Sequence, residues 1–118
     1  MMTKLESLKK NSHFETVLKN RVINNDLFSI YRMKNFIKKK SNNKKLYISF
    51  VMRKKVGNAV KRNRIKRKLK SIVQKLLKIN SAINSNYTYI IFGKTKVYEK
   101  HNEELFEKMK KSFKEMKG

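Results

Sequence analysis

The sequence has no cysteine, no proline and no tryptophan, and only three glycines among its 118 residues. Without cysteine, the chain forms no disulfide, no thiolate zinc site and no cysteine nucleophile. Long apolar runs are also missing, because no segment approaches the roughly 20 apolar residues of a spanning helix, and the start, MMTKLESLKK, lacks a signal-peptide core. These absences predict a soluble protein without a membrane partner and are consistent with a reducing cytoplasm.

Negative charge is scarce as well. The chain carries 8 Asp plus Glu against 32 Lys plus Arg, a formal net charge of +24, and no carboxylate lies between Asp26 and Glu99. A charge of this size is best explained by a polyanionic partner, with nucleic acid as the leading candidate. The same gap argues against an autonomous metal-dependent nuclease, because such enzymes normally bring several carboxylates together. We therefore predict no catalytic residue and no metal ligand in the chain itself.

Apolar residues are frequent enough for a packed core. A hydrophobic content of 39% with 10% aromatic residues predicts one folded domain spanning residues 1–118. Two strands, LFSIYRM and LYISFVMR, alternate apolar and polar positions and are expected to form a hairpin around the lysine-rich loop at 38–45. The run YTYIIFG predicts a third strand.

Three helices are expected around these strands. The first spans about residues 12–20, starting from a Ser12/Glu15 capping box; the second begins near Asn58, and the third is capped by Asn102. The order helix, strand, strand, helix, strand, helix predicts an α+β sandwich, α-β-β-α-β-α, with a small, mainly antiparallel sheet packed by helices.

The second predicted helix has two distinct sides. Its apolar residues follow a helical period and form a stripe for the core: Ile65, Leu69, Ile72, Val73 and Leu76. Polar residues line up roughly opposite: Asn63, Lys66, Arg67 and Lys70. Other lysines of the segment, Lys68, Lys75 and Lys78, are interpreted as ordinary solvated surface.

Arginine is concentrated near this helix. The chain has 26 Lys but only 6 Arg, and four of the six are Arg53, Arg62, Arg64 and Arg67. A guanidinium donates two hydrogen bonds to one phosphate and stacks on a base, which an ammonium does not do. This clustering favours a specific nucleic-acid surface over general solvation.

The predicted sheet offers a second candidate surface. Tyr31, Tyr47, Ser49, Val51 and Arg53 are expected on the strand face that points away from Phe28, Ile48 and Phe50, and Phe14 of the first helix is expected to border them. Aromatic and polar groups beside cations suit an extended single strand, whose bases stack while cations follow the backbone. Ordinary packing of these aromatic residues is the alternative.

The central segment carries a resemblance to a known family. KKVGNAVKRNRIKRKLK resembles the signature of the protein subunit of bacterial ribonuclease P, an Arg-Asn-Arg core followed by Lys-Arg, and LKKNSHFETVLK, LFSIYRM, LYISFVM, NYTYIIFGK and NEELFEKMKKSFKEM resemble its other elements in order. The predicted RNA-binding residues are Arg53, Lys54, Lys55, Asn58, Lys61, Arg62, Asn63, Arg64, Lys66, Arg67 and Lys70.

This resemblance implies a ribonucleoprotein endonuclease that removes the 5′ leader of precursor tRNA. The family's RNA subunit performs the chemistry with Mg²⁺, held mainly by the RNA and the substrate, and no small-molecule cofactor is involved. A left-handed βαβ crossover through the signature helix is also implied, against the usual right-handed rule. The implied leader-binding cleft consists of Phe14, Leu18, Tyr31, Ser49 and Val51.

Four positions depart from the family pattern. Leu18 stands where a second phenylalanine is usual, Val51 and Arg53 stand at usual serines, and Lys70 replaces a usual arginine. Stacking at Leu18 is therefore in doubt, whereas Arg53 offers a phosphate contact in place of a hydroxyl. A small ribosomal or general RNA-binding protein is the competing interpretation, since it explains the charge and size equally well. No helix-turn-helix spacing favours DNA.

Overall fold

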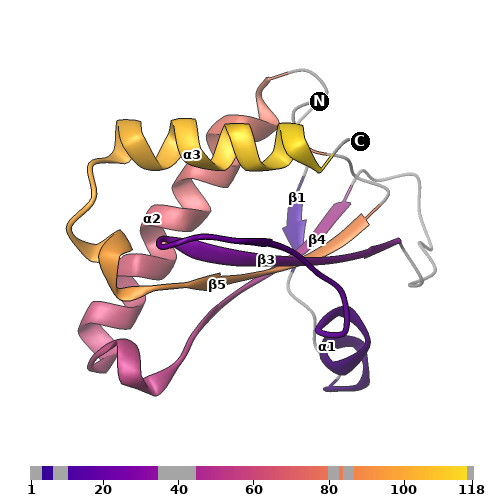
Figure 1. Cartoon of the computed structure of the whole chain (residues 1–118), viewed down its shortest axis with the longest axis horizontal. Helices are drawn as coiled ribbons and strands as arrows, with labels where there is room; N and C mark the ends of the chain where they lie inside the picture. The colour runs from indigo at the N-terminus through magenta and orange to yellow at the C-terminus, as the bar shows by residue number, and fades with distance from the viewer. Residues whose placement is uncertain (1–3, 7–10, 35–44, 80–82, 84–86, 117–118) are drawn as a thin grey trace.

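A computed structural model describes residues 4–6, 11–34, 45–79, 83 and 87–116. The predicted α+β class is confirmed, with three helices and two 3₁₀ turns around one sheet (Figure 1). Along the chain these elements are β1 (Lys4–Glu6), α1 (Asn11–Val17), β2 (Arg21–Asn24), β3 (Phe28–Lys34), β4 (Lys45–Met52), η1 (Lys54–Val56), α2 (Ala59–Leu77), β5 (Tyr87–Gly93), η2 (Thr95–Tyr98) and α3 (Asn102–Glu115).

The sheet has the strand order β1-β4-β5-β3-β2 and is mixed. β1 pairs with β4 and β4 with β5 in parallel, whereas β3 is antiparallel to both β5 and β2. The predicted hairpin between β3 and β4 is wrong, because β5 lies between them. β5 is buried on both faces, and a nearly continuous apolar run such as YTYIIFG is typical of a central strand.

The hairpin of this fold joins β2 to β3 instead. Asn25 makes the turn: its Oδ1 accepts hydrogen bonds from the backbone N–H groups of Leu27 and Phe28, each at 2.9 Å. An Asn side chain that bonds the backbone two residues on mimics a turn, which explains why the chain reverses here. The segment Asn24-Asn25-Asp26 was the sequence signal for this turn, and the short strand before it was not predicted.

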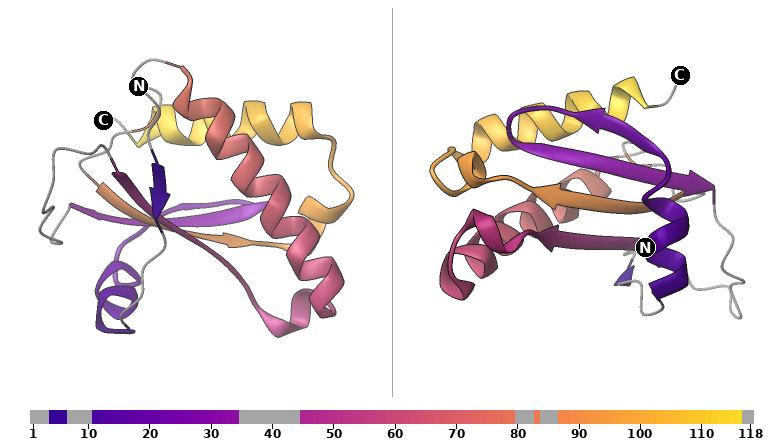
Figure 2. Two further views of the ribbon diagram at one scale, coloured as in Figure 1. Left: turned by 180° about the vertical axis from the view of Figure 1, so that it is seen from behind. Right: turned by 60° about the horizontal axis from the view of Figure 1, so that its bottom comes forward.

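The two faces of the sheet carry different helices. α2 and α3 pack together on one face, whereas α1 contacts β3 and β5 from the other face (Figures 1 and 2). β4, α2 and β5 form a parallel βαβ unit, as the resemblance implied. The left-handed sense of its crossover stays a prediction.

The predicted apolar stripe of α2 is confirmed as core. Ile65, Leu69, Ile72, Val73 and Leu76 are all buried in one cluster with residues of β3, β4, β5 and α3. Burying one such side chain contributes about 1.5–3 kcal/mol to folding. The stripe therefore fixes which side of α2 is left for solvent.

Helix starts were predicted with mixed success. Asn58 is the N-cap of α2, and its Oδ1 accepts a hydrogen bond from the Lys61 backbone N–H at 2.9 Å, as predicted. Ser12 lies inside α1, which begins at Asn11, so the predicted capping box is wrong. Asn102 is the first residue of α3, after the N-cap His101, so the predicted cap at Asn102 is wrong by one residue. The loop predicted at 38–45 lies outside the described residues except for Lys45.

Gly93 ends β5 directly beneath α2. A Cβ added there would lie 2.8 Å from Ile65 Cγ2 and Met52 Sδ and 2.9 Å from Leu69 Cδ1, all in the core. Adding volume to a packed core costs about 1–3 kcal/mol. We therefore expect Gly93→Ala to lower the free energy of unfolding by that amount in urea denaturation. Lys75→Ala, an exposed change on α2, is the control, and an equal effect of the two changes would contradict the tight packing at Gly93.

Candidate nucleic-acid interface

The side of α2 that faces away from the core is basic. Asn63, Lys66, Arg67 and Lys70 are all exposed, opposite the buried stripe, and we call these four residues the outer face of α2. No described carboxylate forms an ion pair with any of them, since the two ion pairs of the described chain, Lys96–Asp26 and Lys100–Glu104, lie elsewhere. The charges of Lys66, Arg67 and Lys70 are therefore available to an external anion.

The remaining signature residues lie on the flanks of α2. The Nζ of Lys61 lies 5.0 Å and the Cζ of Arg64 lies 5.3 Å from the centroid of the Tyr98 ring in η2. Arg62 is half-buried, and its Nε is buried without a hydrogen-bond partner. The predicted RNA-binding residues of α2 are thus divided between an exposed outer face and two flanks, on which Lys61 and Arg62 are half-buried and Arg64 is exposed.

The junction from β4 to α2 adds further cations. Lys54 and Lys55 are exposed in η1, which is anchored by the buried Val56. Gly57 follows with a φ of 150°, a conformation that side chains rarely adopt, and a Cβ there would lie 2.7 Å from Lys61 Cδ. The glycine therefore allows the sharp entry into α2 that keeps both lysines beside its N-terminus.

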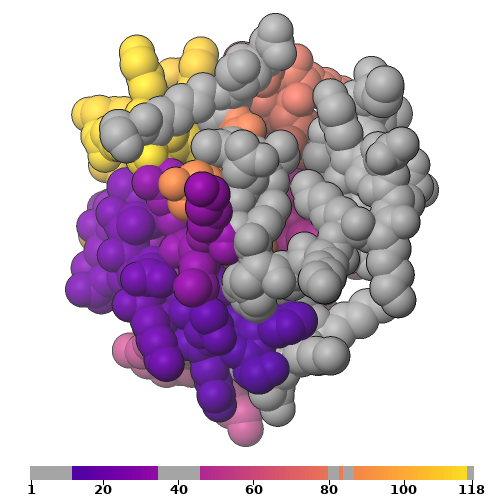
Figure 3. Space-filling model, turned by 90° about the vertical axis from the view of Figure 1, so that its right-hand side faces the viewer, coloured from indigo at the N-terminus to yellow at the C-terminus, as the bar shows by residue number. Residues whose placement is uncertain are grey.

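Aromatic residues cluster on the face of the sheet that α1 contacts. Partly buried side chains pack there around the buried Val17 and Ile90, and we call the following set the aromatic face: Phe14, Tyr31, Tyr47, Val51 and Phe92. The rings of Tyr31 and Phe92 meet edge to face, with centroids 5.5 Å apart. Figure 3 views the molecule from the right-hand side of Figure 1, with the indigo residues of α1 in its lower part and the yellow residues of α3 above them.

The predicted cleft residues are only partly brought together. Phe14, Tyr31 and Val51 share the aromatic face, as expected from the alternation of β3 and β4. Ser49 points to the same side but is only 4% exposed, so little of it is open to a ligand. Leu18 is 36% exposed and lies outside that cluster, one residue beyond the end of α1.

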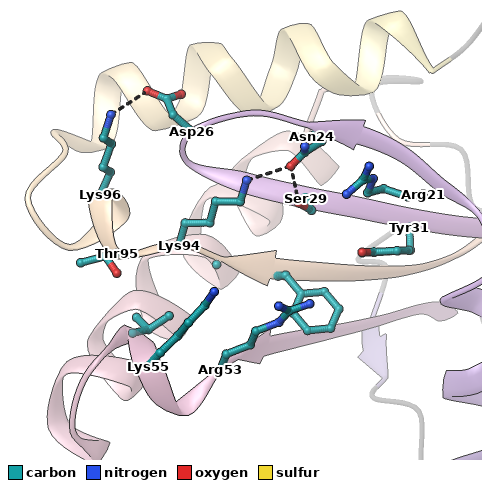
Figure 4. Close-up of a pocket in the computed structure, with 13 residues that line it drawn as sticks. Arg21, Asn24, Asp26, Ser29, Tyr31, Arg53, Lys55, Lys94, Thr95 and Lys96 are labelled. Carbon is teal, nitrogen blue, oxygen red and sulfur yellow. Dashed lines mark hydrogen bonds and ion pairs between the residues drawn. The ribbon is translucent and has the colours of Figure 1, made fainter.

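A basic pocket opens where the aromatic face meets the β4–α2 junction. Its volume is about 540 Å³, and Tyr31, Phe92, Arg53, Arg21 and Lys55 are among the lining residues. Figure 4 shows Arg53 and Lys55 extending toward β3, the strand that carries Ser29 and Tyr31. The Cζ of Arg53 lies 5.5 Å from the centroid of the Phe92 ring, so a ring and a guanidinium share one wall.

Some of the cations that line the basic pocket are paired with polar groups of the protein, and others form no ion pair with a described residue. Lys94 donates hydrogen bonds to Asn24 Oδ1, at 2.8 Å, and to the Asn25 carbonyl, and Lys96 pairs with Asp26 at 3.6 Å (Figure 4). By contrast, Arg21, Arg53 and Lys55 form no ion pair with any described residue. These three cations beside two rings give the pocket the chemistry of a nucleotide site, with positive charge for a phosphate and π surfaces for a base.

Sequence reasoning missed part of this pocket. Phe92 was interpreted only as a strand residue, and Arg21 and Lys94 drew no prediction. The period-2 alternation of β5 was a usable signal, because it places Phe92 on the same side as Ile90 and opposite Tyr89 and Ile91. Arg21 could not be placed, because a four-residue strand leaves too little periodicity to detect.

The described part of the chain has neither a metal-binding cluster nor a membrane-spanning helix. Across the described ranges, no three His, Cys, Asp or Glu side chains lie close enough to hold a metal ion. The carboxylates therefore do not fit a protein-held Mg²⁺ site. None of the helices in the described part of the chain is long and apolar enough to cross a membrane.

An exposed basic helix and an aromatic, cation-lined pocket on one small α+β scaffold are typical of a nucleic-acid-binding protein. The Ribonuclease P family model matches residues 2–117, nearly the whole chain. The chain belongs to the ribonuclease P protein family, and the predicted resemblance is confirmed. It is a protein component of ribonuclease P, a ribonucleoprotein endoribonuclease, which implies an RNA subunit as partner.

Individual relatives agree with this assignment. The ribonuclease P protein component of Mesomycoplasma hyopneumoniae strain 7448 is 30% identical over 118 residues, covering 98% of this chain and 96% of that protein. That of Macrococcus caseolyticus is 41% identical over 70 residues, covering 58% of this chain and 56% of that protein.

Solved structures support the same fold. The RNase P protein of Staphylococcus aureus has a TM-score of 0.68 and 28% identity, covering 94% of each chain. The RNase P protein of Thermotoga maritima has a TM-score of 0.73 at 20% identity, covering 96% of this chain and 99% of that one. The second likeness concerns the fold alone.

Proposed function

We propose that residues 1–118 act as one RNA-binding domain that holds two RNAs at once. The outer face of α2, with the flanking signature residues, binds the catalytic RNA subunit. The aromatic face and the basic pocket hold the single-stranded 5′ leader of precursor tRNA. The protein would thereby assist the Mg²⁺-dependent removal of the leader, in the cytoplasm.

The observation that carries this proposal is the placement of the two surfaces. α2 covers one face of the sheet, whereas the aromatic face lies on the other, and the β4–α2 junction with Arg53 and Lys55 connects them. Two separate binding surfaces on one small protein suit a subunit that bridges an RNA and its substrate. A general RNA-packing protein needs positive charge but has no need of a second, ring-lined site.

The chemistry of the protein's side chains suggests which tasks belong to the protein and which to the RNA subunit. Stacking surfaces and cations bind a single strand without reading much sequence, which suits leaders of varied sequence. Because the described carboxylates do not fit a metal site, Mg²⁺ is assigned to the RNA subunit and the substrate, and the protein contributes no group to the bond that breaks. The protein contributes by binding the RNA subunit and the leader and by orienting the precursor tRNA.

Reconstitution tests the proposal. Precursor tRNA is incubated with the protein alone, with a bacterial ribonuclease P RNA alone at low Mg²⁺, and with both. We expect no cleavage by the protein alone and faster cleavage by the mixture than by the RNA alone, because leader binding adds substrate affinity.

Polylysine added at matched positive charge is the control for charge screening. If polylysine stimulates the RNA as strongly as the protein does, the competing view of a general RNA-binding protein is correct. If the protein gives no stimulation, the proposed function is wrong.

A further inference from the structure

Lys68 does not behave as a surface lysine. It extends from α2 to the turn after β5, where its Nζ donates hydrogen bonds to the carbonyl oxygens of Val97 at 3.2 Å, Tyr98 at 2.8 Å and Lys100 at 3.0 Å. An ammonium has three N–H donors, so these contacts use its full capacity. The interpretation of Lys68 as ordinary solvated surface is therefore wrong.

The surroundings of Lys68 also indicate that its ammonium group contacts the protein rather than the solvent. The side chain is half-buried, and burial, followed by the nearby charge of Arg64, lowers the pKa of the Lys68 ammonium below its usual value. The three carbonyl oxygens offset part of the cost of placing a charge there. An ammonium held in this way is not free to contact an RNA phosphate.

Tyr98 links this clamp to the RNA-binding helix. Its carbonyl is one of the three that Lys68 holds, and its ring lies within 5.0 Å of Lys61 Nζ and 5.3 Å of Arg64 Cζ. A cation over an aromatic ring is attracted by the negative face of the ring. The ring thus restrains two long side chains that would otherwise sample many rotamers.

We infer that Lys68 and Tyr98 are positioning residues that order Lys61 and Arg64 for RNA binding. The clamp fixes the backbone of η2 against α2, and the Tyr98 ring then holds the two cations in place before the RNA arrives. Pre-ordered side chains lose less conformational freedom on binding, which raises affinity without adding a contact. The inference rests on the proposed function, because it assigns these residues a role in binding the RNA subunit.

The Tyr98 ring is tested first, with labelled ribonuclease P RNA and the full-length protein. We expect Tyr98→Leu to weaken RNA binding about three- to tenfold, because Lys61 and Arg64 are then no longer ordered before the RNA binds, and Tyr98→Phe to bind like the wild type. The loss from Arg64→Ala should be smaller in the Tyr98→Leu background than alone, because coupled residues are not additive. Equal binding by the Leu and Phe variants, or fully additive losses, would overturn the inference.

The Lys68 clamp is tested against a matched lysine on the same helix. Lys68→Met and Lys75→Met remove one charge each, one heptad apart, and both are measured well below their melting temperatures. We expect the Lys68 change to weaken RNA binding by severalfold more than the Lys75 change, whereas equal losses would show that Lys68 is structural only. If Lys68→Met does not fold, the Tyr98 series decides. Failure of the wild type itself to bind the RNA would instead overturn the proposed function.

Discussion

Replacing Tyr31 and Phe92 together by leucine is expected to remove most of the protein-dependent affinity for precursor tRNA that carries a leader. Stacking of a base on an aromatic side chain is worth about 1–3 kcal/mol, so the expected loss is on the order of 10- to 100-fold. Leucine keeps apolar volume beside Ile90 and so preserves the packing of the aromatic face. The measurement is the dissociation constant of the reconstituted enzyme for precursor tRNA.

Two controls make this result specific. Mature tRNA, which has no leader, should bind equally well to the wild-type and doubly substituted enzymes. Tyr87→Leu makes the same kind of change on the opposite face of β5, where the Tyr87 ring contacts Arg32 and Tyr89, and should leave leader binding intact. Similar losses for substrates with and without a leader would refute the placement of the leader on the aromatic face.

Neutralising the outer face of α2 is expected to weaken binding of the RNA subunit itself. For Arg67→Gln combined with Lys70→Gln, the loss should be about 10- to 100-fold near 0.1 M salt, because each lost phosphate contact forgoes the release of counterions. The slope of log K against log salt should also fall by about 2, one for each phosphate contact. A filter-binding titration at several salt concentrations measures both quantities.

The matched control removes two charges from the end of the same helix. Lys75→Gln with Lys78→Gln should cost much less affinity, since the resemblance places neither residue on the RNA. Arg67→Lys should give an intermediate loss with an unchanged salt slope, because the charge stays while the planar fork is lost. If both double variants lose equal affinity, α2 binds by bulk charge alone and the outer face has no special role.

Lys68 was interpreted from the sequence as a solvated surface lysine, and its three backbone contacts show that it is not one. The lysines of α2 cannot be told apart in a sequence that contains 26 lysines. Sequence spacing indicates on which side of the helix a lysine lies, but not which groups of other elements lie beside it. The partners of Lys68 are carbonyl groups about 30 residues further along the chain. Only the folded chain brings them within reach.

The fold was predictable wherever one helix or strand carried enough periodicity. The 19 residues of α2 show both the buried stripe and the exposed outer face, and the Asn58 cap marks where the helix starts. β1 and β2, with 3 and 4 residues, are too short for such a signal. The pairing of β3 with β5 was not predicted for another reason. β3 and β4 follow each other in the sequence and were therefore expected to be neighbours in the sheet.

The candidate site was predictable to a similar extent. Arginine clustering and the family signature identified α2, and alternation identified Tyr31 and Val51. Leu18 followed from the resemblance alone, whereas alternation also gave the side to which Ser49 points. Their environments, one exposed beyond α1 and one nearly buried, depend on packing that spacing does not report. Phe92 and Arg21 complete the basic pocket only because β5 and β2 flank β3.

The central position of β5 also sets the order in which a newly made chain is able to fold. β3 and β4 each donate and accept their ladder hydrogen bonds with β5, so the sheet stays in two separate parts until residues 87–93 are available. Contacts between distant segments form slowly, because the entropy of closing the long loop must be overcome first. During synthesis, the basic helix is therefore complete before the sheet that supports it. A chain that stops short of β5 would expose two unpaired strand edges beside a strongly cationic helix, a combination that favours aggregation over function.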